Sequence, residues 1–161
     1  MKKVIFILIS ALVMVSCGAS QVQKEARKTV NGNWNLSDIS FPGSTGDLQV
    51  TLFEDATADC LRNSDWNFIS NNNTGSYVVT NAQCDTNSRF FIWSIDEVDA
   101  ASGTYNLMLK PTDADYDSTT GNQGFRINLV TLTGTNMVWE QTVNFEGDNF
   151  TIRMEFNKIQ K

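Results

Sequence analysis

The sequence predicts an all-β fold, a single antiparallel up-and-down β-barrel of eight or nine strands. Three observations lead to this expectation. Apolar and polar residues alternate with a period of two along several short segments, turns rich in Gly, Asn and Ser separate those segments, and only residues 56–61 suggest a short helix. Strands without intervening helices form an antiparallel barrel or sandwich, and eight or nine of them within about 130 residues favour the barrel.

Rows of large apolar side chains at alternate positions define the expected strands, with the residues between them facing solvent. The run over residues 89–98 is apolar on both faces, which predicts a strand covered on both sides. Pro111 should end its strand, because proline cannot donate to the ladder. In chain order the other rows are Trp34 and Leu36; Leu48, Val50 and Leu52; Trp66 and Phe68; Tyr77 and Val79; Tyr105, Leu107 and Leu109; Phe125, Ile127 and Leu129; Met137, Trp139 and Val143; and Phe150, Ile152, Met154 and Phe156.

The first sixteen residues have the pattern of a cleaved secretory signal. Lys2 and Lys3 precede an apolar run over residues 4–15 that only Ser10 interrupts. As a helix this run would extend roughly 18 Å, well short of the ~30 Å hydrocarbon core of a bilayer. We therefore expect residues 1–16 to be a signal peptide and not a membrane span.

Residues 14–18, Met-Val-Ser-Cys-Gly, resemble the bacterial lipobox. A small residue, Ser16, precedes the bond to be cut, and the thiol of Cys17 would accept the lipid. An ordinary signal followed by a leftover cysteine is the alternative. Because one acyl chain alone holds a protein only marginally, two or three chains such as palmitate on Cys17 are expected to anchor the protein to a membrane.

The residues after Cys17 bear on location and on domain boundaries. By resemblance to lipoprotein sorting rules, Gly18 in place of Asp implies transfer to an outer membrane. Residues 19–24 lack the acidic cluster that resembles a surface-export signal, which favours the periplasm-facing side of the cell envelope. Residues 17–30 have no apolar periodicity and are expected to form a lipidated tether, followed by a barrel domain over residues 31–161.

Composition excludes several classes of function. The formal net charge is −6, and removing residues 1–16 takes away Lys2 and Lys3 and no acidic residue, so the expected mature chain carries −8. Such a surface repels nucleic acid. The chain has no histidine, which removes Ser-His-Asp and Cys-His catalysis and His-ligated zinc. We therefore expect no enzymatic activity, no metal and no cofactor.

Two cysteines remain in the expected barrel, Cys60 and Cys84. An even number in an oxidising compartment predicts a disulfide between them. The chain lacks a CxxC motif, so a catalytic thiol pair is not expected.

Several short motifs resemble those of the lipocalins. Residues 32–34, Gly-Asn-Trp, are similar to the Gly-x-Trp signature that opens the first lipocalin strand. Cys60, then residues 66–68 (Trp-Asn-Phe), 75–77 (Gly-Ser-Tyr) and Cys84 resemble the ordered motifs of the lipocalin-like domain of Bacteroidetes lipoproteins. The resemblance covers residues 31–161, although the second lipocalin motif, Thr-Asp-Tyr, is missing.

This resemblance implies roles for particular residues at one end of the barrel. Gly32 and Trp34 would form the barrel-end signature, with Trp34 closing that end and an arginine beyond the last strand packing over it. Arg153 is the candidate for this arginine.

The expected function is capture of a small hydrophobic ligand in the barrel, without catalysis. The alternative is a structural or interaction lipoprotein of the envelope whose barrel is filled by the same side chains, since eight strands leave room either for side chains or for one small ligand. The sequence does not identify a protein partner. The candidate lining residues are Leu48, Val50, Leu52, Trp66, Phe68, Leu107, Phe125, Ile127 and Trp139.

Overall fold

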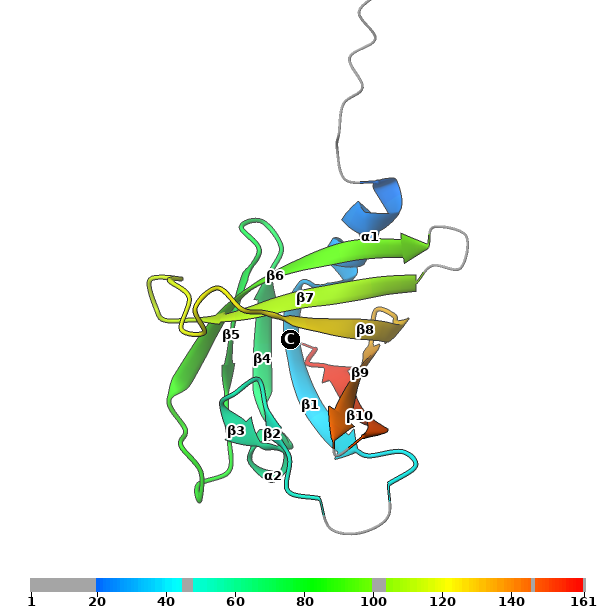
Figure 1. Ribbon diagram of the computed structural model, residues 1–161. Helices are drawn as coiled ribbons and strands as arrows, with labels where there is room; N and C mark the ends of the chain where they lie inside the picture. The colour runs from blue at the N-terminus through cyan, green and yellow to red at the C-terminus, as the bar shows by residue number, and fades with distance from the viewer. Residues whose placement is uncertain (1–19, 45–47, 100–103, 146, 161) are drawn as a thin grey trace, which may run out of the picture.

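A computed structural model describes residues 20–44, 48–99, 104–145 and 147–160, which form a closed antiparallel barrel (Figure 1). Its eight strands follow the order β1-β10-β9-β8-β7-β6-β5-β4 around the barrel. The predicted all-β, up-and-down, lipocalin-like barrel is thus confirmed. The strands are β1 (Gly32–Ser40), β4 (Asp65–Ile69), β5 (Thr74–Val78), β6 (Ser88–Asp99), β7 (Thr104–Thr112), β8 (Phe125–Leu132), β9 (Asn136–Phe145) and β10 (Asp148–Lys158).

The first strand closes the barrel by pairing on both of its edges. One edge of β1 pairs with β10, from Trp34 opposite Lys158 onward, and the other pairs with β4. The register with β10 shifts between Leu36 and Asp38. An extra residue at such a bulge reverses the alternation of side chains, so both Leu36 and Ile39 point into the core.

Aromatic side chains fill much of the barrel interior. Trp66 is at the centre of this packing, with the ring centroids of six other aromatic residues 4.2 to 6.2 Å from its own. These rings make T-shaped, tilted and stacked contacts of the kind that stabilise aromatic cores. The largest fully buried side chains are those of Trp34, Trp66, Trp139, Phe68, Phe91 and Phe156.

The structure differs from the expected tether, because residues 21–30 form a helix, α1 (Gln21–Val30), that packs against β6. The side chain of Ser20 accepts from the amide of Gln23, whose side chain accepts from the amide of Ser20. This capping box stabilises the first turn. Ala26 and Val30, one turn apart, are buried. Because only two of its positions are buried, the helix has no long apolar stripe, and it could not be predicted from apolar periodicity. Cys17 and the expected signal peptide lie outside the described residues.

The segment between β1 and β4 also differs from the expectation. Leu48, Val50 and Leu52 were expected in a barrel strand, but β2 contains only Thr51–Leu52 and pairs with β3 (Ala56–Thr57) in a separate two-stranded sheet. The short helix predicted over residues 56–61 is present as α2 (Ala58–Leu61). Among the described helices, none is long and apolar enough to cross a bilayer.

Candidate functional site

The barrel has two chemically different ends: we name the end at α1 the closed end and the opposite end the mouth. At the closed end, α1 meets the start of β1, the turn between β4 and β5, and the end of β10. At the mouth, the β2–β3 hairpin and α2 lie near the end of β5 and the start of β6, and in Figure 1 they are at the bottom, far from α1 at the top.

Trp34 lies at the closed end of the barrel, where its side chain is fully buried. Its indole N–H donates to the carbonyl of Val30 at 2.7 Å, which joins β1 to the end of α1. The residue over the ring is Lys158, whose Nζ lies 4.2 Å from the ring centroid. Lys158 also donates to the carbonyls of Thr29 and Asn31. Burial lowers the pKa of its ammonium below the usual value for lysine.

The assignment of this position to Arg153 was wrong. Arg153 forms ion pairs with Glu140 at 2.6 Å and Glu155 at 2.9 Å, and these hydrogen bonds raise the pKa of its guanidinium. Gly32 has φ +113°, and a Cβ there would lie 3.3 Å from Cε of Lys158. The glycine therefore permits both the backbone conformation and the close approach of the lysine stem.

The structure separates the candidate lining residues into three groups. Six of them are buried in the core: Leu52, Trp66, Phe68, Leu107, Ile127 and Trp139. Phe125 is partly buried and contacts Phe53, whose ring centroid lies 5.4 Å away. Leu48 and Val50 line a hollow of about 50 Å³ beside α2, and Val50 is partly buried against the core.

Phe53 is the residue that sequence reasoning missed at the mouth. Phe53 and Glu54 both have left-handed backbone conformations, with φ of 57° and 56°, in the turn between β2 and β3. Residues other than glycine rarely adopt this backbone conformation. The turn places the Phe53 ring, which is only 3% exposed, against Trp66 and Phe125. Phe53 thus covers the Trp66 and Phe125 rings at the mouth.

Asp55 holds this turn against the barrel wall. One carboxylate oxygen, Oδ2, accepts from the Tyr77 hydroxyl at 2.8 Å and from Nε of Arg89 at 2.8 Å. Arg89 also donates to the carbonyls of Asp85 and Asn87. Burial, and to a lesser degree the Asp55 carboxylate, raises the pKa of the Tyr77 hydroxyl well above its usual range.

A pocket of about 410 Å³ lies at the mouth beside Phe53. Its lining is more polar than apolar, because Glu54, Asp55, Arg89 and Asp113 lie there beside Phe53, Tyr77 and Pro111. Thr112 also lines it, and within the described part of the chain its buried Oγ1 has no hydrogen-bond partner. The volume is in the range of small-molecule sites.

A second hollow, of about 470 Å³, lies on the outer wall of β6 and β7. Ile92 and Met108 are part of its lining, and both alternate with the inward-facing residues of their strands. This hollow is therefore outside the barrel and separate from the mouth.

The chain was compared with known proteins. No protein-family model matches it, and no curated protein matches it. Among solved structures, it is similar to a lipocalin-like protein from Bacteroides uniformis, with 13% sequence identity, a TM-score of 0.47, and coverage of 81% of this chain and 99% of that one. The topology of its own strands makes the domain a closed, lipocalin-like barrel of eight antiparallel strands.

Proposed function

We propose that this protein is a lipoprotein of the cell envelope that is anchored through acyl chains on Cys17 and binds a small molecule with an apolar body and polar groups at the barrel mouth, without catalysis. The pocket beside Phe53 is the observation that carries the binding proposal. We place the protein on the periplasm-facing side of an outer membrane, on the basis of Gly18 and the residues that follow it.

The cysteine chemistry supports the anchor. The chain has three cysteines, and Cys60 and Cys84 are joined in a disulfide with a Cα–Cα distance of 5.8 Å. Cys17 is therefore left for acylation. In cells fed with labelled palmitate, we expect the wild type and Cys84→Ala to carry the label and Cys17→Ala to lose it. An unlabelled wild type would contradict the anchor.

The mouth is a better site than the barrel interior. Trp66, Phe68 and Trp139 are packed against one another and leave the interior largely occupied by protein. At the mouth, by contrast, a pocket combines the rings of Phe53 and Tyr77 with the charged side chains of Asp55 and Arg89. Small-molecule sites use polar groups to orient a ligand against apolar surface, so this pocket suits a ligand that has both an apolar body and polar groups.

The test uses N-phenyl-1-naphthylamine, a neutral apolar dye, and the chain expressed from Gly18 onward so that no lipid competes. We expect saturable binding that tightens in Phe53→Ala, because truncation opens the space beside Trp66 and Phe125. Val78→Ala, at an exposed position at the end of β5, is the matched control and should bind as the wild type does.

The alternative, an interaction lipoprotein with a filled barrel, is favoured by the aromatic packing around Trp66. Absence of dye binding in both the wild type and Phe53→Ala would support this alternative. Native mass spectrometry of protein purified from membranes separates the two further, since a retained small-molecule adduct is expected only for the binding protein.

A further inference from the structure

The closed end combines basic and exposed apolar side chains around α1. Lys24 and Lys28 are on its exposed face. Val22 in α1 is 41% exposed, and Ile69 and Ile159, at the ends of β4 and β10, are each 40% exposed. Basic residues next to apolar ones are the composition of surfaces that lie on anionic membranes.

Hydrogen bonds hold these residues as one surface. Nη2 of Arg27 donates to the carbonyl of Ser70, next to Ile69, and to the side chain of Asn73. The amide of Ile159 donates to the carbonyl of Asn33 at 2.9 Å. The helix and the flanking strand ends therefore keep their relative positions.

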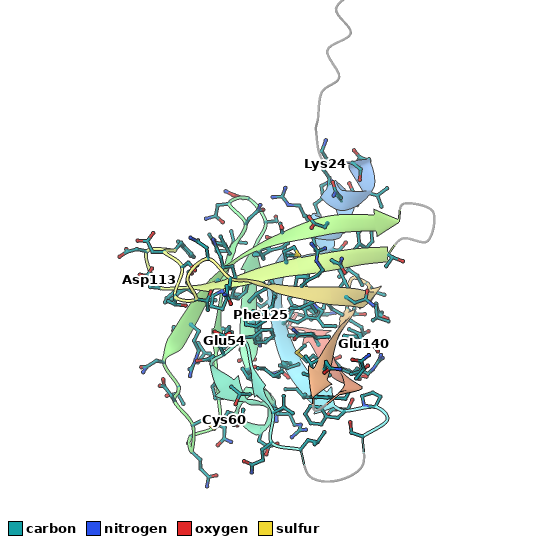
Figure 2. The ribbon with its side chains drawn as sticks, viewed as in Figure 1. Lys24, Glu54, Cys60, Asp113, Phe125 and Glu140 are labelled. Atoms are coloured by element: carbon teal, nitrogen blue, oxygen red, sulfur yellow. A yellow bond between two sulfur atoms is a disulfide. The ribbon has the colours of Figure 1, made fainter. Side chains whose placement is uncertain are left out.

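The charge of the molecule is divided between its two ends. The closed end has Lys24, Arg27, Lys28 and Lys158, against Glu25, Glu97 and Asp99 in the sequence of α1 and β6. Glu25 is paired with Lys28 at 2.7 Å. At the mouth, acidic residues outnumber Arg62 and Arg89: Glu54, Asp55, Asp59, Asp85, Asp113, Asp115 and Asp117. In Figure 2 Lys24 is at the top of the molecule, whereas Glu54 and Cys60 are in its lower half.

The length of chain before α1 agrees with this polarity. Cys17 is three residues before Ser20, the N-cap of α1. Three residues span at most about 11 Å, even when fully extended. An acylated Cys17 would therefore hold the closed end, and not the acidic mouth, close to the bilayer.

We propose that the closed end, formed by the exposed face of α1 with Ile69 and Ile159, is a docking surface for an anionic lipid bilayer, so that the mouth faces away from the membrane. This rests on the proposed anchor at Cys17. Lysines at such a surface each favour association by roughly fivefold, and the acidic mouth is repelled from the same membrane.

The test measures how fast lysines of the acylated, full mature protein react with an acetylating reagent, with mass spectrometry locating the products. The protein is reconstituted in vesicles of phosphatidylcholine mixed with phosphatidylglycerol, in vesicles of phosphatidylcholine alone, and in detergent. We expect Lys24 and Lys28 to react several-fold more slowly on the mixed vesicles than in detergent, with less protection on phosphatidylcholine alone. Lys110, on the wall of β7, should react at similar rates in all three.

Matched variants test the apolar part of the surface. Val22→Ser should restore much of the reactivity of Lys24 and Lys28 on mixed vesicles, whereas Val78→Ser, near the mouth, should not. Protein that floats with the vesicles but leaves Lys24 fully reactive would overturn the docking surface and leave the anchor intact. Protein that carries no acyl chains and does not float would overturn both.

Discussion

The Nζ atom of Lys158 lies 4.2 Å from the centroid of the Trp34 ring, and the strands that carry these two residues pair them directly. The same ammonium group donates to the carbonyls of Thr29 and Asn31, between α1 and β1. One side chain thus joins the last strand of the barrel, the first strand, and the helix that precedes it.

Lys158→Met keeps an apolar stem over Trp34 but removes the charge and the donors. We expect the free energy of unfolding to fall by roughly 1–3 kcal/mol, through loss of the cation–π contact and of the hydrogen bonds to the carbonyls. Urea denaturation measures the change, with Lys110→Met on the barrel wall as the control. Equal midpoints for Lys158→Met and the wild type would contradict this role.

Gly75 in β5 pairs with Phe91 in β6 and lies directly against its ring. A Cβ there would lie 2.3 Å from Phe91 Cζ and 2.6 Å from the carbonyl oxygen of Asn67. Gly75→Ala should therefore destabilise the barrel by about 1–3 kcal/mol, since ring and backbone must both shift. Gly134→Ala is the control, because a Cβ at Gly134 meets nothing within 4 Å. Similar melting temperatures for the two variants would show that the ring moves freely.

The Cys60–Cys84 disulfide joins α2 at the mouth to the segment after β5, across a sequence separation of 24 residues. In the chain-entropy model, closing a loop of this length contributes about 3–4 kcal/mol. We expect the Cys60→Ala, Cys84→Ala double variant to lose stability of this order. Amide hydrogen exchange should speed up in α2 under conditions where α1 is unchanged, and faster exchange in α1 alone would contradict a local role at the mouth.

The strands with strict alternation could be predicted from the sequence. In β10, Ile152, Met154 and Phe156 are buried as expected, because one face of a barrel strand always points inward. The alternation of Leu48, Val50 and Leu52 predicted another such strand, yet this segment continues into the turn that carries Phe53. Alternation with a period of two indicates a half-buried extended segment, but it does not show which strand that segment pairs with.

The residues that give the two ends their character were less visible in the sequence. The Ser20–Gln23 capping box is a local sequence signal for α1, but the segment lacks the apolar spacing by which a helix is usually recognised. Lys158 could not be distinguished from other lysines, because its contact with Trp34 depends on the register between the first and last strands. The bond of Asp55 to Tyr77 likewise joins residues that only the barrel brings together.

The buried hydroxyl of Tyr77 should make stability depend on pH in the alkaline range. In the folded state its pKa is raised, by burial first and by the Asp55 carboxylate second, whereas in the unfolded chain it releases its proton near pH 10. Above about pH 10 the unfolded state therefore gains by ionisation and the folded state does not, so the free energy of unfolding falls as pH rises.

Tyr77→Phe lacks this contribution. It should be less stable than the wild type at neutral pH, because it loses the bond to Asp55, and the difference should shrink as pH rises above 10. Urea denaturation across this range measures both effects, and Asp55→Asn should show a weaker alkaline decline because no carboxylate opposes the phenolate. Wild-type and Tyr77→Phe curves that remain parallel through pH 10 would mean that Tyr77 ionises in the folded barrel as readily as in the unfolded chain.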